Sequence, residues 1–298
     1  MLINTRALCS SALVATCAFS AIPAHAHGVA GNRFFPATIS TDDPAVADEL
    51  SLPTVSSFKN GDDPSATELD IAAEYSKRLT SRLGVSFAGA WTHLGTPGAP
   101  SVSGFQNLET TLKYQFLTSA EHEAIVSAGV SVEWGGTGSD RVGADTTTTV
   151  TPTLYFGKGA GDLPDSLSWA RPFAVTGVVG YGVPTSGGGA RVLGTGVAVE
   201  YSLAYLASHV HDYGLPEFVN HLTPLVEASF QTPVANSDGA RTTGTINPGF
   251  IWSGRHFQLG AEAIVPINRD SGKSVGAVVQ VHFFLDDLFA HSIGKPIW

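Results

Sequence analysis

Alternation of apolar residues with small or polar ones most constrains the fold of this chain. Residues 124–134 read AIVSAGVSVEW, in which valine or alanine recurs at every second position between serine, glycine and glutamate. Successive side chains of a β-strand point to opposite faces, so this period of two predicts strands with one apolar face and one small or polar face. The same pattern predicts twelve strands, at about residues 49–58, 67–77, 83–92, 105–116, 124–134, 147–157, 172–183, 192–206, 220–232, 244–253, 256–267 and 274–285.

The length of the predicted strands separates two all-β architectures. Most run to about 10–12 residues, whereas strands of soluble proteins most often have about 5–6 and a tilted membrane-spanning strand needs about 9–11. Their number is even, and their polar faces carry Gly, Ala and Ser with isolated acids, which suits a barrel lumen. We therefore predict an all-β, up-and-down antiparallel transmembrane β-barrel of about 12 strands over residues 49–285. A soluble β-sandwich is the alternative.

The connections between the predicted strands fall into two sets. One set is rich in Gly, Asp, Ser and Thr, as in residues 95–104 and 185–190, and is typical of solvated turns. The other set is mostly shorter, except for residues 159–171 and 207–219, which are long enough to hold short helices. Twelve strands place both chain ends on this second side, which in bacterial barrels is the periplasmic side.

Composition and the first residues bear on the compartment. Charged residues make up 14% of the chain, the net charge is −10 and no basic cluster is present, which argues against a nucleic-acid partner. Residues 1–26 combine one early positive charge, an apolar stretch and a small-residue site ending at Ala26, which predicts a cleaved signal peptide. We therefore expect a cell outer membrane protein, with outer-membrane lipid and the barrel-assembly machinery as partners. A lipoprotein cysteine at Cys17 is the alternative for this leader.

Two segments flank the predicted barrel. Residues 27–48 form an irregular N-terminal segment, which either plugs the lumen from the periplasm or trails outside it. Residues 286–298 form a C-terminal tail that ends on Trp298. A terminal aromatic resembles the recognition signal for barrel assembly, but Gly294 and Pro296 separate Trp298 from the last predicted strand.

Aromatic residues near the ends of the predicted strands suggest two belts at the membrane interfaces. Amphipathic rings settle at the headgroup level of a bilayer, and outer-membrane barrels carry girdles of such residues. Trp91 and Trp134 fall toward the Gly-rich connections, and the remaining candidates fall toward the other end. The predicted interfacial aromatics are Trp91, Trp134, Tyr201, Tyr205 and Trp252.

Acidic residues share the polar faces of several predicted strands. They predict an acidic lumen, whose field would select permeating solutes by charge. The alternative is a structural network in which Lys113 and neighbouring hydroxyl groups neutralise them. The predicted lumen acids are Asp70, Glu74, Glu109, Glu133, Glu200, Glu227 and Glu262.

Five stretches of the chain resemble uncharacterised Gram-negative outer-membrane β-barrels described as transporters, which relate loosely to a family named for phenol degradation. The resemblance implies an envelope barrel that passes small organic molecules, with aromatic or other apolar compounds favoured. It carries over no catalytic residue. The stretches are HGVAGNRFFPATISTDDPAVADELSLP at 27–53, VEWGGTG at 132–138, LYFGKGAGDLPDSL at 154–167, GTINPGFIWSGRHFQLGAEAIVPIN at 244–268 and HFFLDDLFAHSIGKPIW at 282–298.

No residue pattern predicts catalysis or a cofactor. The chain has no G-x-S-x-G elbow, and its Gly-rich runs lack the spacing of a dinucleotide site. His27, His209 and His211 are weak metal candidates, because imidazole suits Zn and Cu but no closed ligand set appears. We therefore expect no cofactor and no enzymatic activity.

Three functions follow from these patterns. The first hypothesis is passage of an unknown small molecule across the outer membrane. The second is a structural or interaction barrel with a filled lumen. The third is an envelope enzyme with its site at the rim of the barrel. The sequence predicts no oligomeric state.

Overall fold

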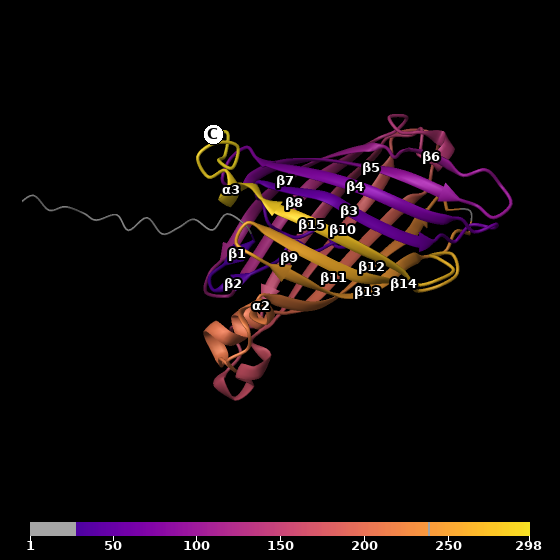
Figure 1. Cartoon of the computed structure of the whole chain (residues 1–298). Helices are drawn as coiled ribbons and strands as arrows, with labels where there is room; N and C mark the ends of the chain where they lie inside the picture. Colours follow the sequence, from indigo (N-terminus) through magenta and orange to yellow (C-terminus); the bar gives the residue numbers. More distant parts are fainter. Residues whose placement is uncertain (1–27, 238) are drawn as a thin grey trace, which may run out of the picture.

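The computed structural model describes residues 28–237 and 239–298, and these form a closed β-barrel (Figure 1). Strand β6 (Val102–Phe105) pairs only with one end of β5, and twelve long strands make the wall, which closes through the pairing of β4 with β5. The predicted up-and-down antiparallel barrel is thus confirmed. The wall strands are β3 (Glu49–Lys59), β4 (Thr67–Arg78), β5 (Leu83–Gly95), β7 (Leu108–Ser119), β8 (Ala124–Trp134), β9 (Thr149–Gly159), β10 (Phe173–Pro184), β11 (Arg191–Tyr201), β12 (Leu222–Ala235), β13 (Thr243–Ser253), β14 (Phe257–Pro266) and β15 (Gly276–Phe284).

Most predicted strand boundaries lie within two residues of the observed ones, but the end of one strand is wrong by five residues and four other boundaries are wrong by three. The strand predicted at 192–206 ends at Tyr201, because the Ser202 hydroxyl accepts a hydrogen bond from the Tyr205 N–H and starts helix α1 (Leu203–Tyr205). The strand predicted to begin at residue 105 begins at Leu108, since the preceding residues fold back along β5 as β6.

Prolines leave local irregularities in the wall, as the absence of a backbone N–H requires. The register of β3 shifts next to Pro53, against both of its neighbours. The ladder between β13 and β14 skips residues 247 and 248, where Pro248 has no N–H to donate. Neither irregularity opens the barrel.

The two faces of the wall differ as the alternation predicts. Buried polar side chains such as Thr92, Ser127 and Asn247 face inward, where they meet other parts of the chain. The outward face is apolar and exposed, which is favourable only against lipid or another apolar surface. Among the exposed outward residues are Ile71, Phe87, Leu112, Val130, Val179, Val199, Val226, Leu259 and Val279.

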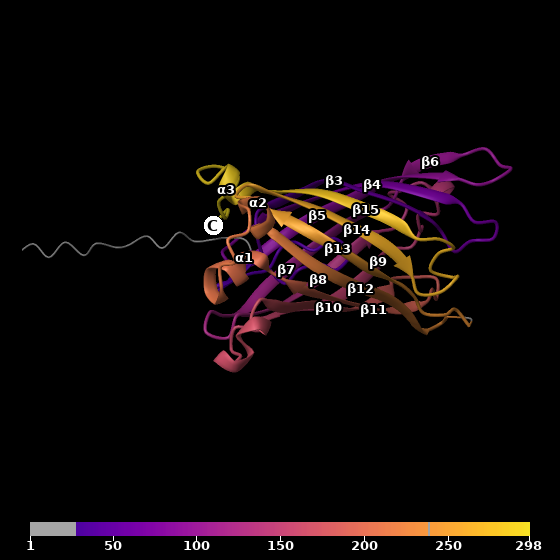
Figure 2. The same ribbon diagram turned by 60° about the horizontal axis from the view of Figure 1, so that its bottom comes forward.

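Both ends of the described chain lie at the end of the barrel where most turns are short, here called the near end (Figures 1 and 2). At the C-terminus, α3 (Leu285–Leu288) follows β15, and the backbone N–H of Trp298 donates to the carbonyl of Leu79 in the β4–β5 turn. The opposite end, here called the far end, carries longer loops and η1 (Asp140–Val142). Which end faces the periplasm stays a prediction.

The residues before the first wall strand lie inside the barrel. A two-stranded hairpin, β1 (Val29–Ala30) and β2 (Arg33–Phe34), leads into residues 35–48, most of which are buried. Phe35 packs in an apolar cluster with Ala30, Ile125 and Ala174. Within the described ranges, no helix has the length and apolar character needed to cross a bilayer.

Candidate functional site: the lumen and its N-terminal segment

Arg33 fixes the entrance of the N-terminal segment at the near end. Its Nε donates to Glu123 Oε2 at 3.2 Å, and Nη1 donates to the carbonyl of Pro172 at 3.0 Å. The Tyr205 hydroxyl donates to the other Glu123 oxygen at 2.8 Å, and the guanidinium lies 3.9 Å from the centre of the Tyr205 ring. All three side chains are buried. A buried charge is tolerated only when paired and hydrogen-bonded, as it is here.

Glu227 holds the middle of the segment against the wall. Its carboxylate accepts hydrogen bonds from three successive backbone N–H groups, those of Ile39 at 2.7 Å, Ser40 at 2.9 Å and Thr41. Successive backbone N–H groups that point into one concavity form an anion-binding nest. Charge-assisted hydrogen bonds of this kind are about twice as strong as neutral ones. Glu227 is therefore a fixed anchor of the segment.

Glycines on the inward face of the wall make room for the segment. A Cβ added at Gly157 on β9 would lie 3.0 Å from Pro44, and one at Gly196 on β11 would lie 3.0 Å from Thr41. Glycine normally weakens a strand interior, and its occurrence there often marks close approach of another backbone. Gly84 and Gly260 face Val46 and Ile39 in the same way.

Lys113 joins the segment to the wall from β7. Its Nζ donates to Asp42 Oδ1 and to the carbonyl of Asp43, each at 2.9 Å, and lies 4.3 Å from the centre of the Tyr155 ring. Lys113 is the cation that the structural alternative assigned to the lumen acids. In the structure its carboxylate partner is Asp42, on the N-terminal segment.

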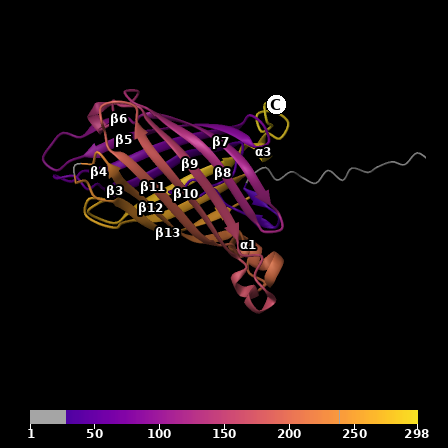
Figure 3. The same ribbon diagram turned by 180° about the vertical axis from the view of Figure 1, so that it is seen from behind.

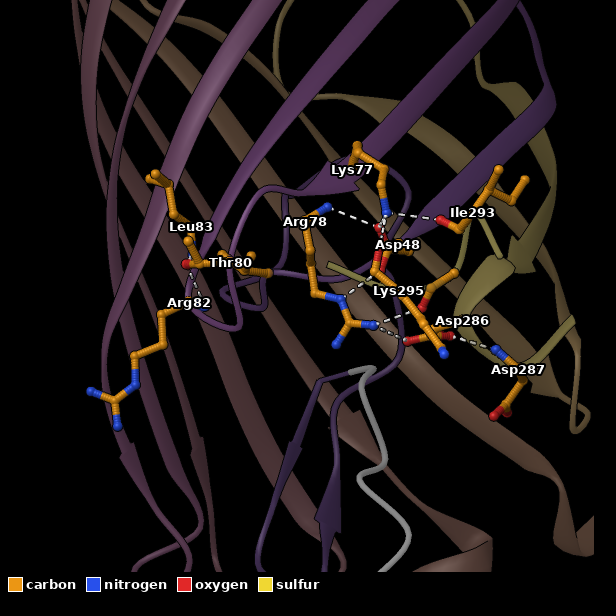
Figure 4. A network of polar contacts seen from close by, with 12 residues as sticks. Asp48, Lys77, Arg78, Thr80, Arg82, Leu83, Asp286, Asp287, Ile293 and Lys295 are labelled. Atoms are coloured by element: carbon orange, nitrogen blue, oxygen red, sulfur yellow. Dashed lines mark hydrogen bonds and ion pairs between the residues drawn. The ribbon is translucent and has the colours of Figure 1, made fainter. Parts of the chain in front are cut away.

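Asp48 ends the segment in a buried network at the near end (Figure 4). Its carboxylate accepts from Lys77 Nζ, from the backbone N–H of Arg78 at 2.9 Å and from Arg78 Nε at 2.6 Å. The same two cations donate to carbonyls of the C-terminal tail, Lys77 to Ile293 at 2.8 Å and Arg78 to Gly294 at 3.0 Å. Asp48 therefore connects the N-terminal segment, β4 and the tail.

The predicted lumen acids all lie on inward faces, but they do not form one ring. Glu227 binds the segment, and Glu262 accepts a 3.4 Å hydrogen bond from the Ser40 hydroxyl. Toward the far end, Glu133 accepts from Asn107 at 2.9 Å and Asp70 from Thr92 at 2.6 Å. The others are Glu109, whose nearest donor is Thr111, Glu200, which is buried, and Glu74, which lines a cavity.

The segment lies between two volumes of the lumen. A cavity of about 250 Å³ on the near side is lined by Asp43, Glu74, Lys113 and His282 among others. A vestibule of about 890 Å³ opens toward the far end. Ser40 and Asp42 line both volumes, so this part of the segment lies at the boundary between them.

The vestibule and the cavity have different linings. Inward threonines of β9 line the vestibule, together with Ser131, Glu133 and Gln231 and the glycines of β10 and β11. Within the cavity, His282 Nδ1 lies 2.9 Å from the Ser51 hydroxyl and Nε2 lies 3.6 Å from Glu49. Carboxylates outnumber cations in the cavity.

Four of the five predicted interfacial aromatics face outward at the strand ends. Trp134 donates from Nε1 to Thr110 at 3.0 Å, and Trp91 stacks on His93. At the near end, Tyr201 and Trp252 face outward on β11 and β13. Tyr205 differs: it lies on α1 and is buried against Arg33, so its prediction as an interfacial residue is wrong.

The weak metal candidates do not form a ligand cluster in the described part of the chain. His209 stacks on Tyr205, with Nδ1 2.7 Å from the Ser208 hydroxyl, and His211 packs edge-on against Tyr213. Residues 28–237 and 239–298 contain no group of three or more potential ligands that could hold a metal ion. His27 lies outside the described residues.

Sequence reasoning missed the residues that hold the segment at its two ends. Glu123, Lys77, Arg78 and Asp48 were not singled out, although charged residues are scarce in this chain. Arg78 and Glu123 fall in predicted turns, Lys77 ends a predicted strand and Asp48 ends the irregular N-terminal segment. Such positions are typical of solvated surface, whereas the structure pairs each residue across a large sequence separation. Burial raises the pKa of the Tyr205 hydroxyl to about 12, helped by its bond to Glu123, so the hydroxyl stays protonated at neutral pH and donates its hydrogen bond.

The closed wall, the apolar outer face and the polar lumen define the class of this protein by its fold, a β-barrel like those of outer-membrane porins and channels. An outer-membrane channel from Pseudomonas putida F1 is similar in structure, with 12% identity, a TM-score of 0.54, and 84% of this chain and 99% of that chain covered. The KdgM porin aligns at 11% identity with a TM-score of 0.48, covering 78% of this chain and 98% of that chain.

Sequence comparison adds no closer assignment. No protein-family model matches the chain, and no curated protein matches it in sequence. The resemblance to the family named for phenol degradation therefore has no support from family models. At 12% identity, the likeness to the Pseudomonas putida channel shows the fold alone.

Proposed function

We propose that this protein is an outer-membrane channel for small polar molecules, narrowed by its own N-terminal segment. The observation that carries the proposal is the position of Ser40 and Asp42 between the near cavity and the far vestibule. A vestibule of this volume open to one end suits entry of a small solute. Movement or partial displacement of the segment would join the two volumes.

The lining favours polar or cationic solutes over the apolar compounds suggested by the resemblance. Hydroxyl groups of Thr149, Thr151 and Thr153 and the carboxylates of Glu109 and Glu133 face the vestibule. A lumen with one sign of charge raises the local concentration of the opposite ion. An apolar solute would leave these groups without hydrogen-bond partners, which is unfavourable.

Single-channel conductance of the refolded protein in a planar bilayer tests the proposal. Glu227→Gln is the decisive variant, because an amide offers one oxygen instead of two and turns an NH₂ group toward the backbone N–H groups of residues 39–41. We expect the variant to show larger or more frequent openings than the unchanged protein. Glu133→Gln is the matched control, since Glu133 lies in the lumen and bonds Asn107 instead of the segment.

The outcomes separate the channel from its alternatives. If neither the unchanged protein nor Glu227→Gln conducts, the filled structural barrel is favoured. The heat-dependent shift in gel mobility must first show that both barrels are folded. A rim enzyme requires a Ser or His bonded to an acid at the mouth. The contact among Ser51, His282 and Glu49 lies in the near cavity behind the segment, and we propose no activity for it.

A further inference from the structure

Two long connections at the near end project sideways beyond the barrel wall (Figures 1 and 3). Residues 160–172 contain η2 (Asp165–Ala170), and residues 202–221 contain α1, η3 (Leu206–Val210) and α2 (Glu217–Asn220). Arg33 contacts both, through the Arg171 carbonyl and the Tyr205 ring. These two adjoining connections are called the rim platform below.

The rim platform exposes large aromatic side chains. Trp169, Tyr213 and Phe218 are 62%, 67% and 63% exposed, and Leu167 and Leu215 are exposed with them. Single exposed apolar residues are normal on any protein, but a group of them on adjoining segments marks an interaction surface.

The exposed aromatics continue the outward face of the barrel. The Tyr201 hydroxyl on β11 donates to the Trp169 carbonyl at 3.3 Å. Trp252 on β13 donates from Nε1 to the Phe218 carbonyl at 3.2 Å, and the two rings stack with centroids 5.7 Å apart. Trp252 in turn packs against Phe257 on β14. The platform therefore adjoins the outward face of the wall at Tyr201 and Trp252.

We propose that the rim platform sits in the phospholipid leaflet at the near end, with Trp169, Tyr213 and Phe218 at the boundary between headgroups and acyl chains. The inference rests on the proposed outer-membrane location and on the predicted periplasmic orientation of the near end. Indole and phenol rings favour this boundary, and amphipathic interfacial segments bury their apolar side about 5–10 Å into it. The sideways projection places the platform beside the wall, where the leaflet surrounds the barrel, instead of beneath the lumen.

The platform also carries charged residues, which supply its polar part. Asp165, Asp212 and Glu217 are exposed, and Arg171 pairs with Asp165 at 2.8 Å. The same connections hold Tyr205, the partner of Glu123 and Arg33. Seating in the leaflet therefore also fixes the position of the residues that hold the N-terminal segment.

Site-directed spin labelling tests this contact in the full mature chain refolded into phosphatidylethanolamine–phosphatidylglycerol vesicles. The only cysteines of the sequence are Cys9 and Cys17, in the predicted leader, so single cysteines can be placed freely. Labels at Trp169→Cys and Phe218→Cys should collide more with oxygen and less with a water-soluble nickel chelate than a label at Asp165→Cys, the matched control in the same platform. Val130→Cys, on the outward wall, provides the lipid reference.

Each possible result either supports or overturns the contact between the platform and the leaflet. Protection of residues 169 and 218 from the chelate, with oxygen access approaching that of residue 130, supports the proposal. Chelate access equal to that of residue 165, with residue 130 still in lipid, overturns the platform contact and leaves the membrane location standing. Water access at residue 130 as well rejects the membrane location itself. Protection from both reagents at residues 169 and 218 overturns the proposal in favour of a protein partner or a second copy.

Discussion

The near and far ends of the lumen are built on different principles. At the near end, buried charges are paired with opposite charges: Arg33 with Glu123, and Asp48 with both Lys77 and Arg78. At the far end, the lining consists of threonine and serine hydroxyls, glycines and partly exposed acids. The first arrangement holds a chain segment in one place, and the second leaves solvent-accessible space with hydrogen-bonding walls.

This difference shows how one barrel combines a fixed and an open half. A low dielectric strengthens the interaction between paired buried charges and makes an unpaired buried charge costly. Substitutions of the charged residues at the near end should therefore lower the stability of the fold. Hydroxyl groups at the far end exchange protein partners for water at little cost. We therefore expect substitutions of the same type to have larger effects on stability at the near end.

Asp48→Asn should produce the largest loss of stability. It removes the buried carboxylate that Lys77 and Arg78 share, while Arg78 retains a 3.9 Å ion pair with Asp286. Breaking a buried ion pair by removing one partner costs about 3–5 kcal/mol. The Asp70 carboxylate accepts from the hydroxyls of Ser56 and Thr92, and Asp70→Asn should cost about 0.5–1.5 kcal/mol. Urea titrations in lipid vesicles measure both. Equal losses would break the distinction between the two ends.

Tyr205→Phe should have the next largest effect. It removes a hydroxyl that donates to the buried Glu123 carboxylate, and hydrogen bonds to charged groups contribute about 1.5–3 kcal/mol. Tyr201→Phe removes only a partly exposed 3.3 Å bond to the Trp169 carbonyl and serves as the control. The two variants should differ in their urea midpoints.

The same tyrosine gives a pH dependence. The pKa of Tyr205 is raised from 10.0 to about 12 in the folded protein. Its contribution to stability is therefore complete below pH 10 and is lost as the pH rises toward 12, since only the unfolded chain ionises readily in that window. Tyr205→Phe should show a flatter fall in stability between pH 10 and 12 than the unchanged protein. Parallel curves would contradict the buried donor role.

Gly157→Val tests the glycine lining with a smaller expected effect. A Cβ added at residue 157 would lie 3.0 Å from Pro44 and 3.2 Å from Phe35. Valine should therefore displace the segment or the strand and lower the free energy of unfolding by about 1–3 kcal/mol, the usual range for overpacking. A Cβ at Gly182, in the far half, meets no atom closer than 3.5 Å. Gly182→Val should therefore be close to neutral, and a greater loss there would refute the assignment of open space.

Glu133→Gln should have the smallest effect on stability and a measurable effect on ion selectivity. The amide preserves size and hydrogen bonding toward Asn107, while the vestibule loses one negative charge. If the barrel conducts, reversal potentials in a salt gradient should show a weaker cation preference, most clearly at low ionic strength, because salt screens the field. An unchanged reversal potential with a lowered urea midpoint would assign Glu133 to a structural network.

The candidate site could be foreseen only in part. The inward orientation of Glu227 and Glu262 follows from their place in the alternation, and the structure keeps it. The role of Glu227 as an anchor for Ile39, Ser40 and Thr41 could not be foreseen, since it joins residues nearly 190 positions apart with no pattern between them. Tyr205 shows the converse error, because the alternation continues past the point where Ser202 ends the strand.

The sequence by itself determined the wall: the strand number, the boundaries of most strands, and which side chains face outward. These follow from a period of two that each strand carries locally, independent of its neighbours. Only the tertiary structure decided what fills the lumen. Closing the sheet brings Glu123, Glu227 and Lys113 around a segment that has no periodicity of its own. The need for glycine opposite that segment arises only because a second backbone packs against the wall there.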